Sequence, residues 1–190
     1  MAEPRLSPIE RSWNPLVLLL RAVMRLVVGD VIPQAKILFP RAPKTIPAHL
    51  MMLSTMEYGL SLPPRRNVLI RLMASQTNDC EFCFDLSAYL ATRSKYVDDA
   101  DLQAFASFES SDRFDEADRA MLRYVREINQ SEGSSDETFN TLREYFSEKE
   151  IVEITWLDAA ENYLNLQSRP LGISSQGYCA LPESTIKTGN

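Results

Sequence analysis

The sequence predicts an all-α fold, and three observations support that prediction. Apolar residues recur at helical spacing from end to end, and no alternating strand with a hairpin turn is evident. Prolines and glycines stand between these periodic segments, where helices start and stop. With 190 residues, 45% hydrophobic and 24% charged, the chain has the size of one soluble domain that buries its core without disulfide or metal staples.

The first expected element is an apolar segment over residues 16–28, which carries Arg21 and Arg25. Arginines four residues apart share one helical face, so we expect an amphipathic packing helix with them on its polar side. Its apolar side would be made of Leu18, Leu19, Ala22 and Leu26. Because a membrane-spanning helix needs about 20 apolar residues and the flanks do not fit a signal peptide, we expect a cytoplasmic protein with no membrane partner.

The next segment, residues 33–47, holds four prolines and is predicted to be an extended arm. It divides the chain into an N-terminal helix and arm over residues 1–47, a helical core over 48–172 and a tail over 173–190. Within the core, helices are expected over residues 48–58, from Pro64 onward, and over 80–94, 98–108, 114–129, 135–146 and 148–166.

Three capping patterns fix helix starts in this prediction. Asn78 or Asp79 would cap the helix beginning at Cys80, and capping boxes pair Ser134 with Glu137 and Ser147 with Glu150. The last helix is expected to bury a broad stripe made of Val152, Thr155, Trp156, Ala159 and Tyr163.

Charge and composition exclude several functional classes. A net charge of -6 would repel phosphate backbones, and no local basic patch offsets it, so no nucleic-acid partner is expected. Only 3 Cys and 6 Gly argue against a secreted disulfide framework and a glycine-rich phosphate loop. His49 is the sole histidine, which rules out any mechanism that needs two imidazoles. We expect no bound cofactor and no metal.

The motif that carries chemistry is Cys80-Glu81-Phe82-Cys83. At a helix start, two cysteines three residues apart can form a disulfide, and the helix N-terminus favours thiolate. The pair therefore predicts a redox dithiol, although small buried thiols and half of a zinc site share this spacing. Zinc is disfavoured because the remaining nitrogen and sulfur ligands, His49 and Cys179, are distant in sequence.

Two segments of the chain resemble the carboxymuconolactone decarboxylase and alkylhydroperoxidase D-like superfamily. The first covers residues 69–86 around the cysteine pair, and the second covers 146–156, followed by Glu161-Asn162-Tyr163 and Arg169-Pro170-Leu171-Gly172. The resemblance implies a helical bundle that assembles into trimers or hexamers and reduces peroxides. It also implies that Cys83 reacts with the peroxide, while Cys80 meets an external reductant, often a lipoyl-type dithiol.

The chain departs from the family's pattern at both proton-handling positions. Ser87 stands where the motif carries a histidine, and Val68 stands where it carries a relay glutamate. Ser87 shares the helical face of Cys83 and can hydrogen-bond a thiolate, but it cannot exchange a proton near neutral pH. Glu161 is a candidate replacement, because burial in the apolar final helix would raise its pKa. A hydrogen-bonded packing carboxylate is the plainer interpretation of Glu161, as a structural histidine is of His49.

Three functions follow in order of preference. The first is a thiol-dependent hydroperoxide reductase that uses Cys83, Cys80, Ser87 and Glu161, weakened by the two replacements. The second is a silenced or redox-sensing structural oligomer of the same fold. The third is a lactone decarboxylase, for which the cationic residues Arg65, Arg66 and Arg71 would bind an acidic substrate. Surplus apolar residues over 16–28 and 50–56 favour a homo-oligomer.

Overall fold

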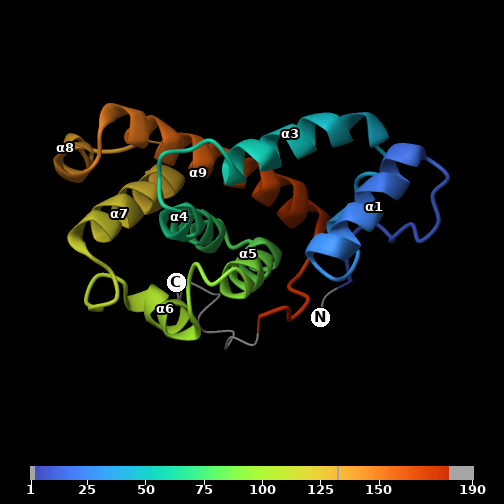
Figure 1. Ribbon diagram of the computed structural model, residues 1–190, viewed down its shortest axis with the longest axis horizontal. Coiled ribbons are helices and arrows are strands. Elements are labelled where there is room, and N and C mark those ends of the chain that lie inside the picture. The colour runs from blue at the N-terminus through green and yellow to red at the C-terminus, as the bar shows by residue number, and fades with distance from the viewer. Residues whose placement is uncertain (1–2, 132, 180–190) are drawn as a thin grey trace.

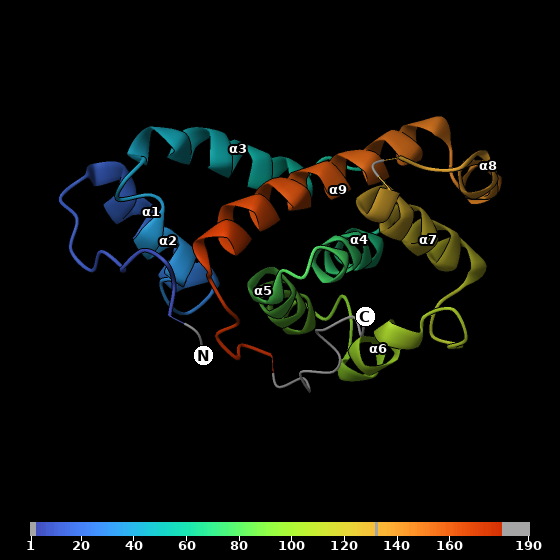
Figure 2. The same ribbon diagram turned by 180° about the vertical axis from the view of Figure 1, so that it is seen from behind.

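A computed structural model describes residues 3–131 and 133–179. The regular secondary structure of this part of the chain is entirely helical, without a strand (Figures 1 and 2). The all-α prediction is confirmed. The α-helices are α1 (Pro15–Val27), α2 (Pro33–Ile37), α3 (Ile46–Glu57), α4 (Pro64–Thr77), α5 (Glu81–Arg93), α6 (Asp99–Ala104), α7 (Glu116–Ser131), α8 (Asp136–Tyr145) and α9 (Glu148–Ser168). Three 3-10 turns join them: η1 (Pro43–Thr45), η2 (Phe105–Ser107) and η3 (Arg169–Leu171).

Helix α4 lies at the centre of the bundle and packs against α5, α7 and α9 (Figure 1). Its position explains its composition, because Leu69, Ile70 and Leu72 point to different sides and are all buried. The main core fills the space between these helices and includes Phe84, Phe105, Phe114, Met121, Leu157 and others. We call this buried set the bundle core.

A second buried cluster lies where the N-terminal region meets the start of α5. It contains apolar residues of α1, α2 and the following loop, among them Leu20, Ile37 and Phe39, together with Cys80, Phe82, Cys83 and Ile173. We call this set the disulfide cluster. The predicted arm is therefore not extended. Pro33 and Pro47 stand in the first turns of α2 and α3, where a missing N–H is tolerated, so the prolines begin helices there.

Two predicted helix faces are reversed in the structure. Helix α1 buries Val17, Leu20, Arg21 and Met24, and it exposes Leu18, Leu19, Ala22 and Leu26. Arg21 is tolerated inside because its guanidinium donates to the backbone carbonyl oxygens of Ile9 and Glu10. On α9, the expected stripe Val152, Thr155, Trp156, Ala159 and Tyr163 is exposed, while Ile151, Ile154 and Leu157 face the core.

Helix caps agree with the sequence only in part. The capping box of Ser147 and Glu150 is present at α9, but α8 is capped by Ser135, so the box of Ser134 with Glu137 is wrong. At α5, neither Asn78 nor Asp79 is the cap; Cys80 itself occupies that position. None of the helices in the described ranges is long and apolar enough to cross a membrane.

The chain after α9 lies along α5. Residues 173–179 follow η3 without regular structure, and most of the predicted tail, residues 180–190, lies outside the described residues (Figure 2).

Candidate redox site

The cysteine pair forms a disulfide at the beginning of α5. Cys80 and Cys83 have Cα atoms 5.3 Å apart and are joined through their sulfurs. Cys80 is the N-cap residue of α5 and Cys83 lies in its first turn. The backbone fixes this arrangement, because the N–H of Cys80 donates to the carbonyl of Ser75 at 2.8 Å and the N–H of Phe84 donates to the carbonyl of Cys80 at 3.0 Å.

Both sulfurs are buried in apolar surroundings. Cys80 is 2% exposed and Cys83 is 6% exposed, and both belong to the disulfide cluster with residues of α1 and α2. The N-terminal region, which the sequence placed outside the core domain, thus packs with the redox pair in one buried cluster.

The two family positions carry Ser87 and Val68, neither of which titrates near neutral pH. Ser87 lies one turn after Cys83 on α5 and is buried, and Val68 is a buried apolar residue of α4. The hydroxyl of Ser87 is a hydrogen-bonding group on the face of α5 that carries the cysteines.

Glu161 lies on α9, which packs against α4. Its carboxylate is 1% exposed and accepts hydrogen bonds from Ser75 Oγ at 3.0 Å, Arg71 Nε at 3.2 Å and Asn165 Nδ2 at 3.2 Å. Burial raises the pKa of Glu161, and the charge of Arg71 opposes that rise. Because the carbonyl of Ser75 also receives the N–H of Cys80, one residue links Glu161 to the disulfide.

His49 lies on α3 with its ring packed against Phe39 at 4.8 Å and Tyr163 at 6.1 Å, measured between ring centroids. It is 2% exposed, and its Nδ1 atom is buried with no hydrogen-bond partner. Burial lowers the pKa of His49 to about 4, so the imidazole is neutral at physiological pH. The histidine is therefore part of the packed interior between α3 and α9.

Asp85 is a functional candidate to which the sequence alone assigned no role. It lies on α5, two residues after Cys83, and is 0% exposed. Its carboxylate accepts hydrogen bonds from four groups of the C-terminal segment: the Ser175 hydroxyl and the backbone N–H groups of Gln176, Tyr178 and Cys179. Helical spacing alone gave no sign of these bonds, because the donors are 90 or more residues away and three of the four are backbone groups.

The arginines proposed for a lactone site are already paired. Arg65 and Arg66 both bind Asp118, at 2.6 and 2.9 Å. Arg71 binds Glu57 at 2.6 Å in addition to Glu161. Since carboxylates of the chain neutralise all three guanidinium groups, this set does not form a free anion site, and the lactone function loses its support.

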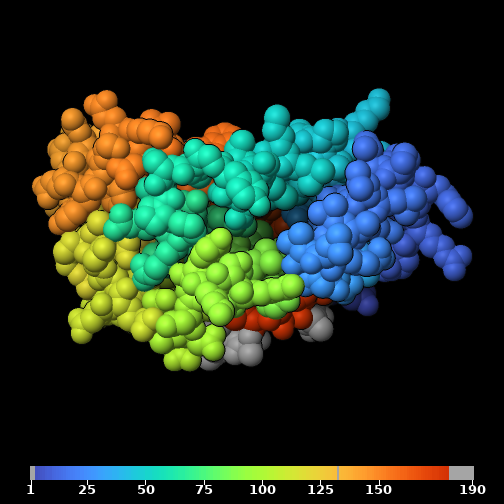
Figure 3. All heavy atoms as spheres, in the orientation of Figure 1, coloured from blue at the N-terminus to red at the C-terminus, as the bar shows by residue number. Residues whose placement is uncertain are grey.

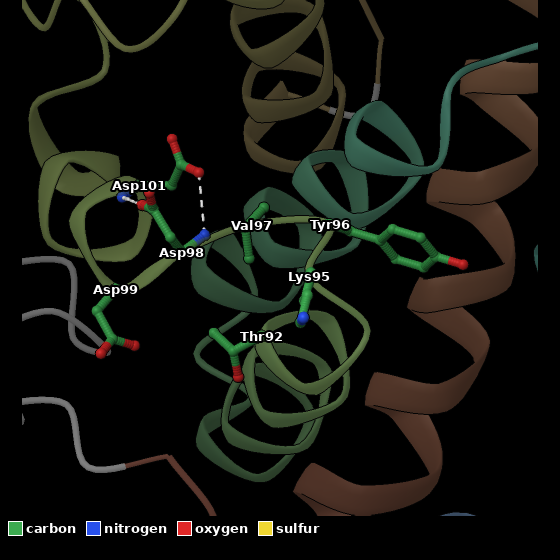
Figure 4. A pocket seen from close by; sticks show the side chains of 7 residues that line it. All are labelled: Thr92, Lys95, Tyr96, Val97, Asp98, Asp99 and Asp101. Atoms are coloured by element: carbon green, nitrogen blue, oxygen red, sulfur yellow. Dashed lines mark hydrogen bonds between the residues drawn. The ribbon is translucent and has the colours of Figure 1, made fainter.

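The hollow drawn in Figure 4 is a weaker candidate for the functional site than the cysteine pair. It measures about 470 Å³ and is lined by Thr92, Lys95, Tyr96, Val97, Asp98, Asp99 and Asp101. Two of its carboxylates stabilise the local fold. Asp98 and Asp101 form a reciprocal capping box at the start of α6, as the dashed lines in Figure 4 show. Asp101 also accepts from Arg113 at 2.9 Å. These bonds leave the acidic group satisfied within the protein.

Known structures share this architecture. No protein-family model and no curated protein matches the sequence. The debrominase Bmp8 is 21% identical over 95% of both chains, with a TM-score of 0.80, and one of its structures is a cysteine-to-alanine variant in complex with 2,3,4-tribromopyrrole. A putative antioxidant defence protein AhpD of Agrobacterium tumefaciens is 27% identical over 72% of this chain and 94% of that one, with a TM-score of 0.66.

An uncharacterized peroxidase-related protein of Ralstonia eutropha JMP134 with an alkylhydroperoxidase AhpD core is 17% identical over 93% of this chain and 94% of that one, with a TM-score of 0.76. These matches show that the chain has the alkylhydroperoxidase D-like fold, and its cysteine pair lies at the start of α5.

Proposed function

We propose that this protein is a thiol-dependent hydroperoxide reductase whose redox centre is Cys80 and Cys83. The observation that carries the proposal is the disulfide across the first turn of α5, because the same two sulfurs supply and store the two electrons of peroxide reduction. The similarity to an AhpD-type antioxidant protein supports the same chemistry.

The reaction proceeds in three balanced steps. The Cys83 thiolate attacks one peroxide oxygen, the O–O bond breaks, and the alcohol leaves after taking a proton, so that Cys83 becomes a sulfenic acid. The Cys80 thiolate then attacks the sulfur of Cys83 and forms the S–S bond, the S–O bond breaks, and the hydroxide takes a proton from solvent and leaves as water. An external dithiol, of the lipoyl type in the resembling family, reduces the resulting disulfide by exchange and becomes a disulfide itself.

Two side chains support this centre in the proposal. Ser87 donates its hydroxyl hydrogen to the Cys83 thiolate and so favours the charged form. Glu161 acts through Ser75 as a positioning residue that holds the α4–α5 junction against Cys80. With no imidazole on the cysteine face, we expect slow peroxide turnover, because general acid–base help contributes about 10²–10⁴-fold.

We also propose that the protein works as a homo-oligomer. Helix α1 exposes Leu19 and Leu26, helix α3 exposes Met51, and helix α9 exposes Val152 and Leu166, with Leu26 as much as 82% exposed. Helix α3 contacts both α1 and α9, so the three helices that carry these exposed residues are neighbours. Contacts between copies would cover them.

A second candidate function is reductive dehalogenation of a small aromatic compound. It is favoured by the debrominase, which matches this fold over 95% of both chains. The electron balance is the same as for a peroxide: two thiols give a disulfide, while the carbon–bromine bond is replaced by carbon–hydrogen and bromide leaves with a proton. The same cysteine pair would serve.

A single-turnover experiment separates these possibilities. The protein is reduced, freed of reductant and mixed with either cumene hydroperoxide or 2,3,4-tribromopyrrole, and alcohol, bromide and free thiols are quantified. A hydroperoxide reductase forms one alcohol per disulfide, and Cys83→Ser abolishes this, while Cys80→Ser leaves a sulfenic acid that dimedone traps. Bromide release without alcohol would favour dehalogenation. Intact thiols after both treatments would exclude redox catalysis and leave a structural oligomer.

A further inference from the structure

The residues 173–179 form a segment that we call the C-terminal strap. The chain enters it after a turn at Gly172, whose φ of +66° lies in the left-handed region that glycine adopts readily. A second left-handed glycine, Gly177 at +69°, lies inside it. The strap carries no helix and runs beside α5, the helix that bears the disulfide (Figures 2 and 3).

Asp85 binds the strap to α5. Its four donors lie 2.7 to 3.1 Å away and are the Ser175 hydroxyl and the backbone N–H groups of Gln176, Tyr178 and Cys179. Hydrogen bonds to an ionised carboxylate are the stronger kind, and here they converge on a side chain with no exposed surface. The ring of Tyr178 adds a contact with Tyr89 of α5 at 5.7 Å.

The strap also closes the disulfide cluster from outside. Ile173, its first residue, is 6% exposed and belongs to the same buried cluster as Cys80 and Cys83. The outer side of Ile173 lines a hollow of about 300 Å³ between the strap and the N-terminal segment, with Pro8 and Lys36 on the opposite wall. Ile173 thus belongs both to the wall of this hollow and to the cluster that buries the redox pair.

A movement is required before any reagent reaches the sulfurs, since they are 2% and 6% exposed. Besides α5, the N-terminal region and the strap contribute buried residues to the cluster that holds them. The N-terminal region contributes most of the buried apolar residues of the cluster from α1, α2 and their loops, so its detachment would expose much apolar surface. The strap contributes one buried residue, Ile173, and has no helix to unfold. Releasing the strap therefore exposes less of the cluster's apolar surface and breaks its hydrogen bonds to Asp85.

We propose that the C-terminal strap is a gate over the Cys80–Cys83 disulfide, latched by Asp85 and opening at Gly172 to admit the reductant. The inference rests on the proposed function in that it assumes an exchangeable disulfide. It adds that access to this disulfide is set by a carboxylate that takes no part in the electron transfer. Asp85 is thus a positioning residue that acts through the strap.

The test measures how fast the disulfide is reduced in the folded, full-length protein. Dithiothreitol is added under native conditions, and new thiols are alkylated and counted by mass spectrometry at timed intervals. Asp85→Asn replaces an acceptor oxygen by an amide donor facing backbone N–H groups, so we expect reduction about tenfold faster or more. Ile173→Ala keeps the latch and thins the cover, and we expect a smaller acceleration of a few-fold.

A matched control is Glu153→Gln. Glu153 is a buried carboxylate of α9 that likewise holds a loop, through the N–H and hydroxyl of Ser61 at 2.9 and 2.6 Å, but it lies in the part of the bundle away from the disulfide cluster. We expect its reduction rate to match the wild type. Circular dichroism establishes that each variant is folded, and if Asp85→Asn is not, Ile173→Ala decides.

Unchanged reduction rates in the folded variants would overturn the gate, and so would an equal acceleration in Glu153→Gln, which would indicate general loosening. The measurement needs no peroxide. A gated disulfide in a protein that does not consume hydroperoxide would sustain this inference while refuting the proposed function.

Discussion

The bundle core and the disulfide cluster are built in different ways. The bundle core is made by helices α4, α5, α7 and α9, which pack side chains against one another along their lengths. The disulfide cluster is assembled from segments far apart in sequence: the N-terminal helices, the first turn of α5 and Ile173 of the strap. Contacts along packed helices form one cooperative unit, whereas a cluster closed by a short segment can open locally. The difference places the reactive sulfurs in the part of the molecule able to open without unfolding the rest.

The largest expected effect comes from the bundle core. Phe105 is 0% exposed and touches the rings of Phe84 and Phe114 at 6.2 and 6.1 Å between centroids. Phe105→Ala should lower the free energy of unfolding by about 3–5 kcal/mol, because it leaves a cavity among helices that cannot collapse. Denaturant titration measures it. A loss below about 1 kcal/mol would contradict the description of the bundle core as a tightly packed unit.

Glu161 connects the two regions, so its replacement tests both. Glu161→Gln keeps the shape but leaves Arg71 with only its partly exposed partner Glu57, and we expect a loss of unfolding free energy of about 2–4 kcal/mol. If Glu161 only positions the cysteine loop, cumene hydroperoxide consumption should fall several-fold with an unshifted pH profile. A profile that loses an ionisation would instead make Glu161 a proton carrier. Arg71→Met, which removes the other member of the Arg71–Glu161 ion pair, serves as the companion variant.

His49 offers a pH-dependent way to sharpen the comparison. Its pKa is lowered by burial to about 4 in the folded protein, against about 6.5 unfolded, so its contribution is present above pH 6.5 and lost as pH falls toward 4. Over that window the wild type should lose on the order of 3 kcal/mol relative to His49→Gln, which does not titrate. Asp158, whose pKa burial raises to about 6, acts in the opposite direction in both proteins, so only their difference isolates His49. Parallel stability curves would refute this.

The smallest expected effect is at the end of the bundle remote from the disulfide. Ser147 caps α9 by accepting from the N–H of Glu150, and Ser147→Ala should lower the free energy of unfolding by about 1 kcal/mol. Thermal unfolding measures it. The rate of disulfide reduction should stay at the wild-type value, because α9 begins far from the disulfide cluster; a changed rate would mean that the two regions are not separate.

Some features followed from local sequence alone. Helical periodicity, the Ser147–Glu150 box and the placement of Cys80 and Cys83 at a helix start depend on residues within a turn or two of one another, and the structure confirms them. The family resemblance rested on the same local motifs. Ser87 and Val68 could also be identified as departures, since the family motif fixes their distance along the sequence from the cysteines.

Tertiary structure decided which face of each helix is buried and what surrounds the sulfurs. An apolar residue does not reveal whether it faces a core or another molecule, so α1 and α9 were assigned the wrong buried faces. The hydrogen bonds of Asp85 join positions 90 or more residues apart, and three of the four use backbone donors, which every residue type except proline possesses. The sequence by itself therefore determined the helices and the dithiol, while long-range packing determined that the dithiol is enclosed and which segment encloses it.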